Sequence, residues 1–188
     1  MTKKNIGIII GSLRKGSFSR SVANALIELA PEALAAHIVE IGNLPLYNQD
    51  MDDEGNTPES YPQFRKEIAA LDGVLFVTPE YNRSMPAVLK NALDVASRPY
   101  GQNQWNGKPG AIVSVSMGTM GGMAANLALR QPMVFLNVPL MQQPEAYIGK
   151  AQDLLDDKGV LVNESTRAFL KNYMEAYAEW VMTLSPKR

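Results

Sequence analysis

A short segment near the amino terminus combines glycines, hydroxyl groups and positive charge. It reads Gly11-Ser12-Leu13-Arg14-Lys15-Gly16-Ser17-Phe18-Ser19, with an apolar run before it and a helical pattern after it. The glycines permit a tight turn, and hydroxyls and backbone N–H groups at the start of a helix can donate to an anion. A turn that only capped the helix would need neither two cations nor three hydroxyls. We interpret this segment as a phosphate cradle.

Two common phosphate-binding motifs do not match this segment. A Walker loop requires Lys and then Ser or Thr after its second glycine, whereas Ser17 and Phe18 follow Gly16. The dinucleotide fingerprint requires a second glycine at the position that Leu13 occupies. The ligand that remains is a monophosphate held by hydroxyl and amide groups without a magnesium ion.

Two further segments could bind the rest of such a ligand. The first reads Thr78-Pro79-Glu80-Tyr81-Asn82-Arg83-Ser84-Met85-Pro86, and its aromatic, amide and carboxylate groups can hold a flat heteroaromatic ring. Taken alone, it equally fits a rigid loop in which Ser84 caps a helix. The second reads Ser116-Met117-Gly118-Thr119-Met120-Gly121-Gly122, and its glycines would let the backbone approach a ligand closely. Such glycine-rich turns are common, so the inference depends on all three segments meeting.

Apolar patterns place each of the three segments directly after a strand. Compact apolar runs predict strands at 6–10, 37–41, 74–77, 111–115 and 138–141. Helical spacing predicts helices near 22–30, 64–71, 86–96, 124–130 and 169–184, and Pro132 is expected to kink or end the fourth. Residues 42–60 are expected to form a long loop whose acids are solvated, because they lack the spacing of a calcium-binding loop.

Strands alternate with helices along the whole chain, which predicts an α/β fold with a parallel sheet and helices on both faces. Five strands within 188 residues favour the doubly wound flavodoxin-like order 2-1-3-4-5, in a single domain spanning residues 1–188. In such sheets ligands bind beyond the carboxyl ends of the strands, between the first and third. A phosphate cradle facing a ring-binding loop there is a mononucleotide site. The mononucleotide expected in this architecture is a flavin.

Composition removes several other kinds of chemistry. The chain has no cysteine, which excludes disulfides, thiolate metal sites and a cysteine nucleophile. His37 is the single histidine and is expected to be structural, so we predict no metal site. A net charge of −1 favours neither nucleic acid nor an anionic membrane as a partner. Without a long apolar stretch or a signal-peptide pattern, we expect a cytoplasmic protein without membrane insertion.

The sequence resembles the NADPH-dependent FMN reductase family, on its branch of quinone, chromate and azo-dye reductases. The family's phosphate loop resembles Gly-Ser-x-Arg-x-x-Ser-x-Asn, which Gly11, Ser12, Arg14 and Ser17 match. Its Pro-Glu-Tyr-Asn motif is met in full at residues 79–82. The likeness runs from about residue 5 to the last helix, and the first two motifs in register are strongly specific.

The resemblance implies which residues hold the flavin. Residues from Gly11 and Ser12 to Ser19 would hold the FMN phosphate and ribityl chain. The loop after the third strand would contact the isoalloxazine largely through backbone groups, with Pro79, Glu80, Tyr81, Asn82 and Arg83. The other edge of the ring would be bordered by Ser116, Met117, Gly118 and Gly121.

Three positions depart from the family pattern. Ser19 stands where Asn is usual, which predicts a shorter or water-mediated contact. Ala87 replaces a frequent Gly after the ring loop and would tighten the site. Val95 stands where an aromatic residue is common in the third helix, which changes part of the expected subunit packing.

The resemblance implies an NAD(P)H-dependent oxidoreductase in which tightly bound FMN carries the chemistry at N5, so that no catalytic side chain is required. NADPH or NADH would deliver a hydride and leave. A small-molecule acceptor such as a quinone, a flavin, an azo dye or chromate would then be reduced, in a ping-pong mechanism. The acceptor and the preference between NADPH and NADH are left open.

A flavodoxin-type electron carrier without NAD(P)H activity is the alternative. Such carriers tend to be strongly acidic and lack cations in the phosphate loop, so Arg14, Lys15 and the near-neutral charge argue against it. The family resemblance further implies a homodimer or homotetramer. The helices near 86–96 and 124–130 are the interface candidates, and the resemblance implies that a neighbouring subunit would cover the flavin.

Overall fold

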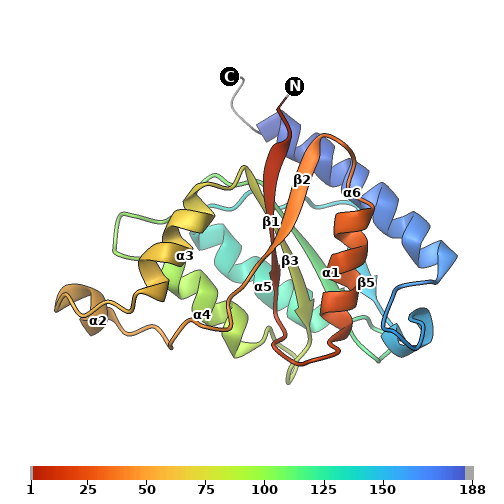
Figure 1. Cartoon of the computed structure of the whole chain (residues 1–188), viewed down its shortest axis with the longest axis horizontal. Coiled ribbons are helices and arrows are strands. Elements are labelled where there is room, and N and C mark those ends of the chain that lie inside the picture. Colours follow the sequence, from red (N-terminus) through yellow and green to blue (C-terminus); the bar gives the residue numbers. More distant parts are fainter. Residues whose placement is uncertain (1, 185–188) are drawn as a thin grey trace.

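The computed structural model describes residues 2–184 and shows a five-stranded parallel sheet between two layers of helices (Figure 1). The strands are β1 (Lys4–Ile10), β2 (Leu34–Val39), β3 (Gly73–Pro79), β4 (Gly110–Val115) and β5 (Ala146–Ile148). They lie in the order β2-β1-β3-β4-β5, and every neighbouring pair is parallel. The predicted flavodoxin-like order is therefore confirmed.

The central strands are apolar along most of their length because helices cover both faces of the sheet. One face packs against α1 (Phe18–Glu28) and α6 (Glu164–Leu184), and the other against α3 (Ser60–Ala69), α4 (Ala87–Ala96) and α5 (Met123–Phe135). Alternate residues of β1 serve the two layers: Ile8 and Ile10 pack toward α1 and α6, and Ile9 packs toward the other helices.

The predicted loop at 42–60 contains a short helix, α2 (Gln49–Asp53), whose first turn is capped by Asn48. Its acids are not all solvated, which corrects the expectation. The Asp52 carboxylate is 6% exposed and accepts two hydrogen bonds from Arg65 of α3, at 2.9 and 2.6 Å. A buried carboxylate needs such a partner. The guanidinium of Arg65 holds the pKa of Asp52 below its usual value, although burial opposes that shift.

The prediction of a strand at 138–141 is wrong. In that run only Leu140 forms an isolated bridge, to Gly110, and the fifth strand of the sheet is β5. Pro139 accepts a hydrogen bond from Gly110 N at 3.0 Å but has no N–H to donate, so the ladder does not develop there. The apolar run instead fills the core, where Val138 and Met141 are buried.

Pro132 does not end the fourth predicted helix, which was one of the two outcomes expected of it. It lies inside α5, which continues to Phe135. The missing N–H removes one helical bond, but the carbonyl of Pro132 still accepts from Leu136 N at 2.9 Å. Leu129 and Met133 on either side of it are buried, and this packing holds the helix together.

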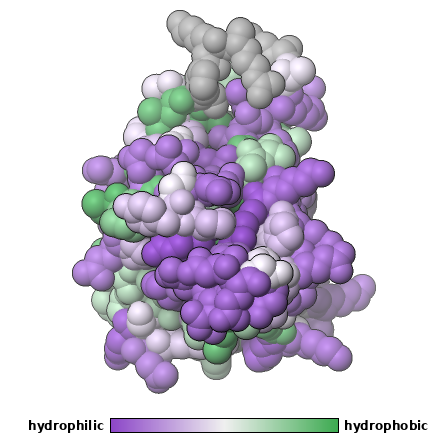
Figure 2. Space-filling view, turned by 90° about the vertical axis from the view of Figure 1, so that its left-hand side faces the viewer, coloured by the Kyte–Doolittle hydropathy of each residue, from purple (hydrophilic) through white to green (hydrophobic). Residues whose placement is uncertain are grey.

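The surface offers no long apolar helix. Among residues 2–184, no helix is both long and apolar enough to cross a membrane. The face that carries α2 and α3 is mainly hydrophilic and is interrupted by smaller hydrophobic areas (Figure 2). The last described element before α6 is a short 3₁₀ turn, η1 (Ala151–Leu154), which leads from β5 toward it.

Candidate functional site

The carboxyl ends of β1, β3 and β4 bring the three predicted segments to one edge of the sheet. Register pairs Ile10 with Val77 and Pro79 with Val115, so the segments begin side by side. A cavity of about 490 Å³ opens there. Residues from all three segments line it: Ser12, Arg14, Ser17, Phe18, Ser19, Pro79, Tyr81, Val115, Ser116 and Met117. The meeting place is the one that the strand order predicts.

The segment after β1 buries its hydroxyls and exposes its charges. Ser12, Ser17 and Ser19 are 5%, 3% and 1% exposed. The chain turns at Gly16, whose φ of +66° is readily adopted only by glycine. Arg14 donates to the carbonyl of Gly16 at 3.1 Å, and its guanidinium lies over the Phe18 ring, 5.6 Å from the centroid.

The N-terminus of α1 is open to an anion. Ser17 is its N-cap residue, but the side chain makes no capping bond, and the first turn contains no acidic residue. The positive end of the helix dipole is therefore not neutralised from within the helix. None of the described residues that line the cavity carries an acidic side chain. This end of the cavity is suited to a dianionic or monoanionic phosphate ester.

The Ser19 hydroxyl provides an independent sign of a missing ligand. Ser19 lines the same cavity, and its hydroxyl oxygen is buried and has no hydrogen-bond partner among the described residues. A buried hydroxyl without a partner costs roughly 1–3 kcal/mol. A phosphate or ribityl oxygen would supply the partner that the protein itself does not. The residues present thus fit the phosphate half of FMN.

The segment after β3 forms a tight turn that presents an aromatic ring. Tyr81 and Ser84 exchange two backbone hydrogen bonds of 3.0 Å, and the residues between them, Asn82 and Arg83, have φ of 51° and 63°. This is the pattern of a type I′ turn, in which both central residues are left-handed. Tyr81 lines the cavity and remains 49% exposed, so its ring is available to a ligand.

Glu80 has a different role from its neighbours. Its side chain is 14% exposed and does not line the cavity. One carboxylate oxygen, Oε2, accepts from the backbone N–H groups of Ala124 and Ala125 at 3.0 and 3.3 Å, and Oε1 accepts from Arg83 at 3.1 Å. Sequence reasoning did not find this contact with α5, because nothing local in the chain indicates it.

The segment after β4 is shaped by close backbone approach. Gly121 has φ of +60°, and a Cβ there would overlap the backbone of Tyr147 in β5. Ser116 continues the pairing with β5 beyond the end of β4, because its N–H donates to the carbonyl of Ile148 at 3.0 Å. Ser116 and Met117 line the cavity, and the Met117 side chain is 62% exposed.

The remaining predicted residues lie in the same loops without lining the cavity. Gly11 permits close packing, because a Cβ there would crowd Leu89 and Pro79. The others that belong to this group are Leu13, Lys15, Gly16, Glu80, Asn82, Arg83, Gly118 and Gly121. One lining residue, Val115, is absent from the predicted set. It is the last residue of β4, and only its position at the end of a strand could have indicated it.

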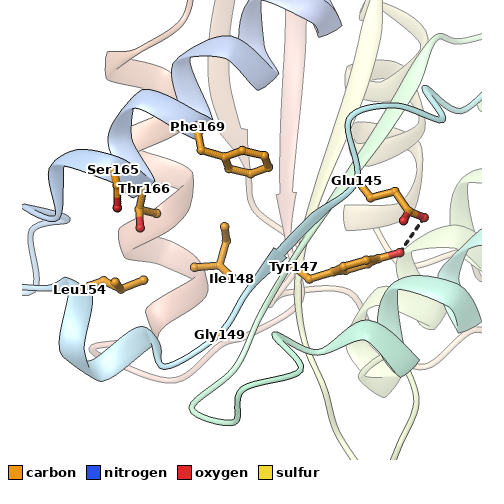
Figure 3. A pocket seen from close by; sticks show the side chains of 8 residues that line it. All are labelled: Glu145, Tyr147, Ile148, Gly149, Leu154, Ser165, Thr166 and Phe169. Atoms are coloured by element: carbon orange, nitrogen blue, oxygen red, sulfur yellow. Dashed lines mark hydrogen bonds between the residues drawn. The ribbon is translucent and has the colours of Figure 1, made fainter.

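A second cavity, of about 440 Å³, lies between β5 and α6 (Figure 3). Ile148 and Phe169 line it, and Tyr147 donates to Glu145 at 2.7 Å. Burial, followed by this hydrogen bond to a carboxylate, raises the pKa of Tyr147. No Lys or Arg is among the described residues that line this cavity, so it offers no charge partner for a phosphate.

The single histidine does not line the cavity. His37 is in β2, and its Nε2 lies 3.9 Å from Glu67 on α3. Within the described part of the chain, no group of His, Asp and Glu side chains is arranged to hold a metal ion.

Comparison with known proteins gives a consistent result. Residues 4–153 match the family model of NADPH-dependent FMN reductases. A quinone reductase of Pseudomonas putida is 58% identical over 177 residues, which is 94% of each chain. A 2-hydroxy-1,4-benzoquinone reductase of Burkholderia sp is 49% identical over 94% of this chain and 95% of its own. The solved structure of FerB, a flavoenzyme NAD(P)H:(acceptor) oxidoreductase from Paracoccus denitrificans, has a TM-score of 0.89 at 37% identity, covering 97% of this chain and 99% of that one.

Proposed function

Because the chain belongs to the NADPH-dependent FMN reductase family, we propose that it reduces quinones with electrons from NAD(P)H, using FMN bound in the cavity at the carboxyl edge of the sheet. The observation that carries this proposal is the cavity itself. The segment after β1 contributes buried hydroxyls and the start of α1, and the segments after β3 and β4 contribute an exposed tyrosine and an exposed methionine. Such a cavity suits a ligand with a phosphate at one end and a flat ring at the other.

The residues of the first loop would hold the phosphate and ribityl parts. Ser12, Ser17 and Ser19 supply hydroxyls, α1 supplies backbone N–H groups, and Arg14 supplies positive charge. The flavin, when bound, accepts a hydride at N5 and passes electrons to an acceptor. The protein contributes binding, orientation and electrostatics, and therefore needs no acid–base side chain of its own.

The ring end of the cavity favours planar acceptors. Tyr81 can stack with an aromatic ring, and Met117 offers a flexible, polarizable contact. Quinones, free flavins and azo dyes share the planar shape that these side chains contact. Chromate lacks it, so we propose chromate as the poorer acceptor. A chromate kcat/KM equal to that of a benzoquinone would contradict this ranking.

The exposed side chains of Tyr81 and Met117 form one rim of the cavity, and a shared rim would favour a ping-pong cycle. NAD(P)H and the acceptor would contact the same rim of Tyr81 and Met117, and so would occupy it in turn. Double-reciprocal plots at several fixed quinone concentrations should therefore be parallel. Converging lines would indicate a ternary complex and a second binding face.

An absorption spectrum of the purified protein tests the central proposal directly. Protein that carries FMN should show flavin bands, and NADPH added under nitrogen should bleach them quickly. A flavin spectrum that NADPH and NADH both leave unchanged would favour an electron carrier. Failure to bind FMN after incubation would contradict the assignment of the cavity.

A further inference from the structure

The Glu80 carboxylate connects the two loops at the ring end of the cavity. It belongs to the segment after β3, yet it accepts two backbone hydrogen bonds from the first turn of α5, which follows the loop after β4. Between residues 79–86 and 116–125 no other hydrogen bond is present in the part of the chain that the structure describes. The β3–β4 ladder ends just before these loops, at Pro79 and Val115.

The start of α5 lacks a cap of its own. Its N-cap residue is Gly122, which is left-handed and has no side chain to accept from the first turn. The first N–H groups of a helix have no partner within the helix, and a carboxylate there also interacts favourably with the helix dipole. Glu80 therefore supplies, from the segment after β3, the acceptor that a Ser, Thr or Asp at position 122 would otherwise supply.

We propose that Glu80 is a positioning residue for the flavin: by capping α5 from the neighbouring loop, its carboxylate fixes Ser116 and Met117 against Tyr81 and so sets the width of the ring end of the cavity. This inference rests on the flavin site proposed above. Because Glu80 does not line the cavity, its effect reaches the ligand through the two loops that do. Binding of FMN should in turn tighten the cap, since both events favour the same loop arrangement.

The test compares two Glu80 variants with a control variant that removes the N-cap of another helix. Glu80→Ala removes the cap, and Glu80→Gln keeps an acceptor oxygen without the charge. Asn163→Ala removes the cap of α6, where the Asn163 side chain accepts from Thr166 N at 3.0 Å, outside the cavity. For each apoprotein we would measure the Kd for FMN by flavin fluorescence and the midpoint of thermal unfolding. Hydrogen exchange at the amides of Ala124 and Ala125 would be followed with and without FMN.

Glu80→Ala is expected to weaken FMN binding about five- to tenfold, which corresponds to the loss of a cap. Glu80→Gln should restore most of that affinity. Asn163→Ala should lower the unfolding midpoint and leave the Kd unchanged. In the wild-type protein, FMN should slow exchange at Ala124 and Ala125, a readout that needs no variant to fold.

Two results would overturn the inference. In the first, Glu80→Ala lowers the unfolding midpoint as Asn163→Ala does, but FMN binds with unchanged affinity, so Glu80 is only a cap. In the second, FMN binds to the wild-type protein without slowing exchange at the two alanine amides. A protein that binds no FMN, or that keeps its affinity after Arg14→Ala with Ser17→Ala, would instead refute the flavin site itself.

Discussion

The Ser19 hydroxyl is buried and makes no hydrogen bond to another described residue, so the fold gains no intramolecular hydrogen bond from it. Ser19→Ala removes that group and should leave the apoprotein equally stable or slightly more stable. The same change should weaken FMN binding several-fold, because the ligand loses a hydrogen bond. Thermal unfolding without flavin and fluorescence titration with FMN measure the two effects.

If Ser19→Ala lowers the affinity for FMN without lowering the stability of the apoprotein, the hydroxyl binds the ligand and is not needed for the fold. Ser21→Ala is a suitable control, because Ser21 lies on the same helix but does not line this cavity. A loss of apoprotein stability in Ser19→Ala, with FMN affinity intact, would show that the hydroxyl serves the fold.

Arg14 and Ser17 can be tested together as the polar end of the same cavity. Arg14→Ala with Ser17→Ala removes one charge and one buried hydroxyl that line it. Charge-assisted hydrogen bonds contribute roughly 1.5–3 kcal/mol, so FMN affinity should fall at least about tenfold. Riboflavin lacks the phosphate, and its affinity should change much less. An equal loss of affinity for FMN and riboflavin would show that the phosphate does not bind at these residues.

At the scale of elements, the pair between Asp52 and Arg65 ties α2 to α3. The pKa of Asp52 is lowered by its hydrogen bonds to Arg65, so the pair stabilises the fold fully above the ordinary carboxyl pKa of about 3.9. That stability is lost as the pH falls below this value and through the lowered pKa. Asp52→Asn should destabilise the protein at pH 7 and flatten the acid limb of its stability curve.

Chemical denaturation of both proteins between pH 7 and pH 3 measures this difference. Glu28→Gln is the matched control, because Glu28 pairs with Arg167 at the surface, where its side chain is 61% exposed. Exposed pairs contribute little, so that variant should stay close to wild type at every pH. Parallel stability curves for wild type and Asp52→Asn would contradict the assigned role of the pair.

Other elements show where pattern reading succeeds and where it fails. The runs at β1, β3 and β4 are compact and apolar because both of their faces are buried, and their positions were predictable. The edge strand β5 has only three residues, and Tyr147, which is partly buried, lies between two buried neighbours. Its pattern of apolar residues is therefore too short to predict a strand. The run at 138–141 is more apolar and therefore has the stronger strand pattern, although it forms no strand. Pro132 lies inside α5 because tertiary packing outweighs the local effect of a helix breaker.

At the scale of the whole molecule, α5 exposes apolar side chains that the fold does not cover. Val134 and Phe135 are 83% and 80% exposed, and Leu127, which lies two helical turns before Val134 on the same face of α5, is 47% exposed. We propose that α5 contributes to self-association, as the family resemblance implies. Val134→Lys with Phe135→Lys should shift the protein toward monomer in sedimentation velocity, because charge is costly to bury in an interface.

The control for that experiment is Val160→Lys with Val162→Lys, which adds the same two charges at half-exposed apolar positions outside α5. This control should leave the sedimentation coefficient unchanged. A wild-type protein that is monomeric at micromolar concentration, or an unchanged oligomer in the variant of Val134 and Phe135, would show that α5 is not the interface.

The first four strands, the three loops that follow the first, third and fourth of them, and the family motifs could all be predicted from the amino-acid sequence. These properties are local: apolar periodicity, glycine and proline positions, and short motifs can be read without knowing what lies opposite them. The segment 11–19 and the Pro-Glu-Tyr-Asn motif are short local patterns that follow predicted strands, so the sequence predicts that they belong to one site.

The contacts of individual side chains could not be predicted from the sequence and are visible only in the folded structure. Glu80 belongs to the motif, but its carboxylate meets α5, and Asp52 belongs to an acidic run, but it is buried against Arg65. The Ser19 hydroxyl is unsatisfied because of what surrounds it, although its own neighbours in sequence are ordinary. The physical reason is that hydrogen bonding and burial depend on elements far apart in the chain, and these are brought together by packing that no local pattern encodes.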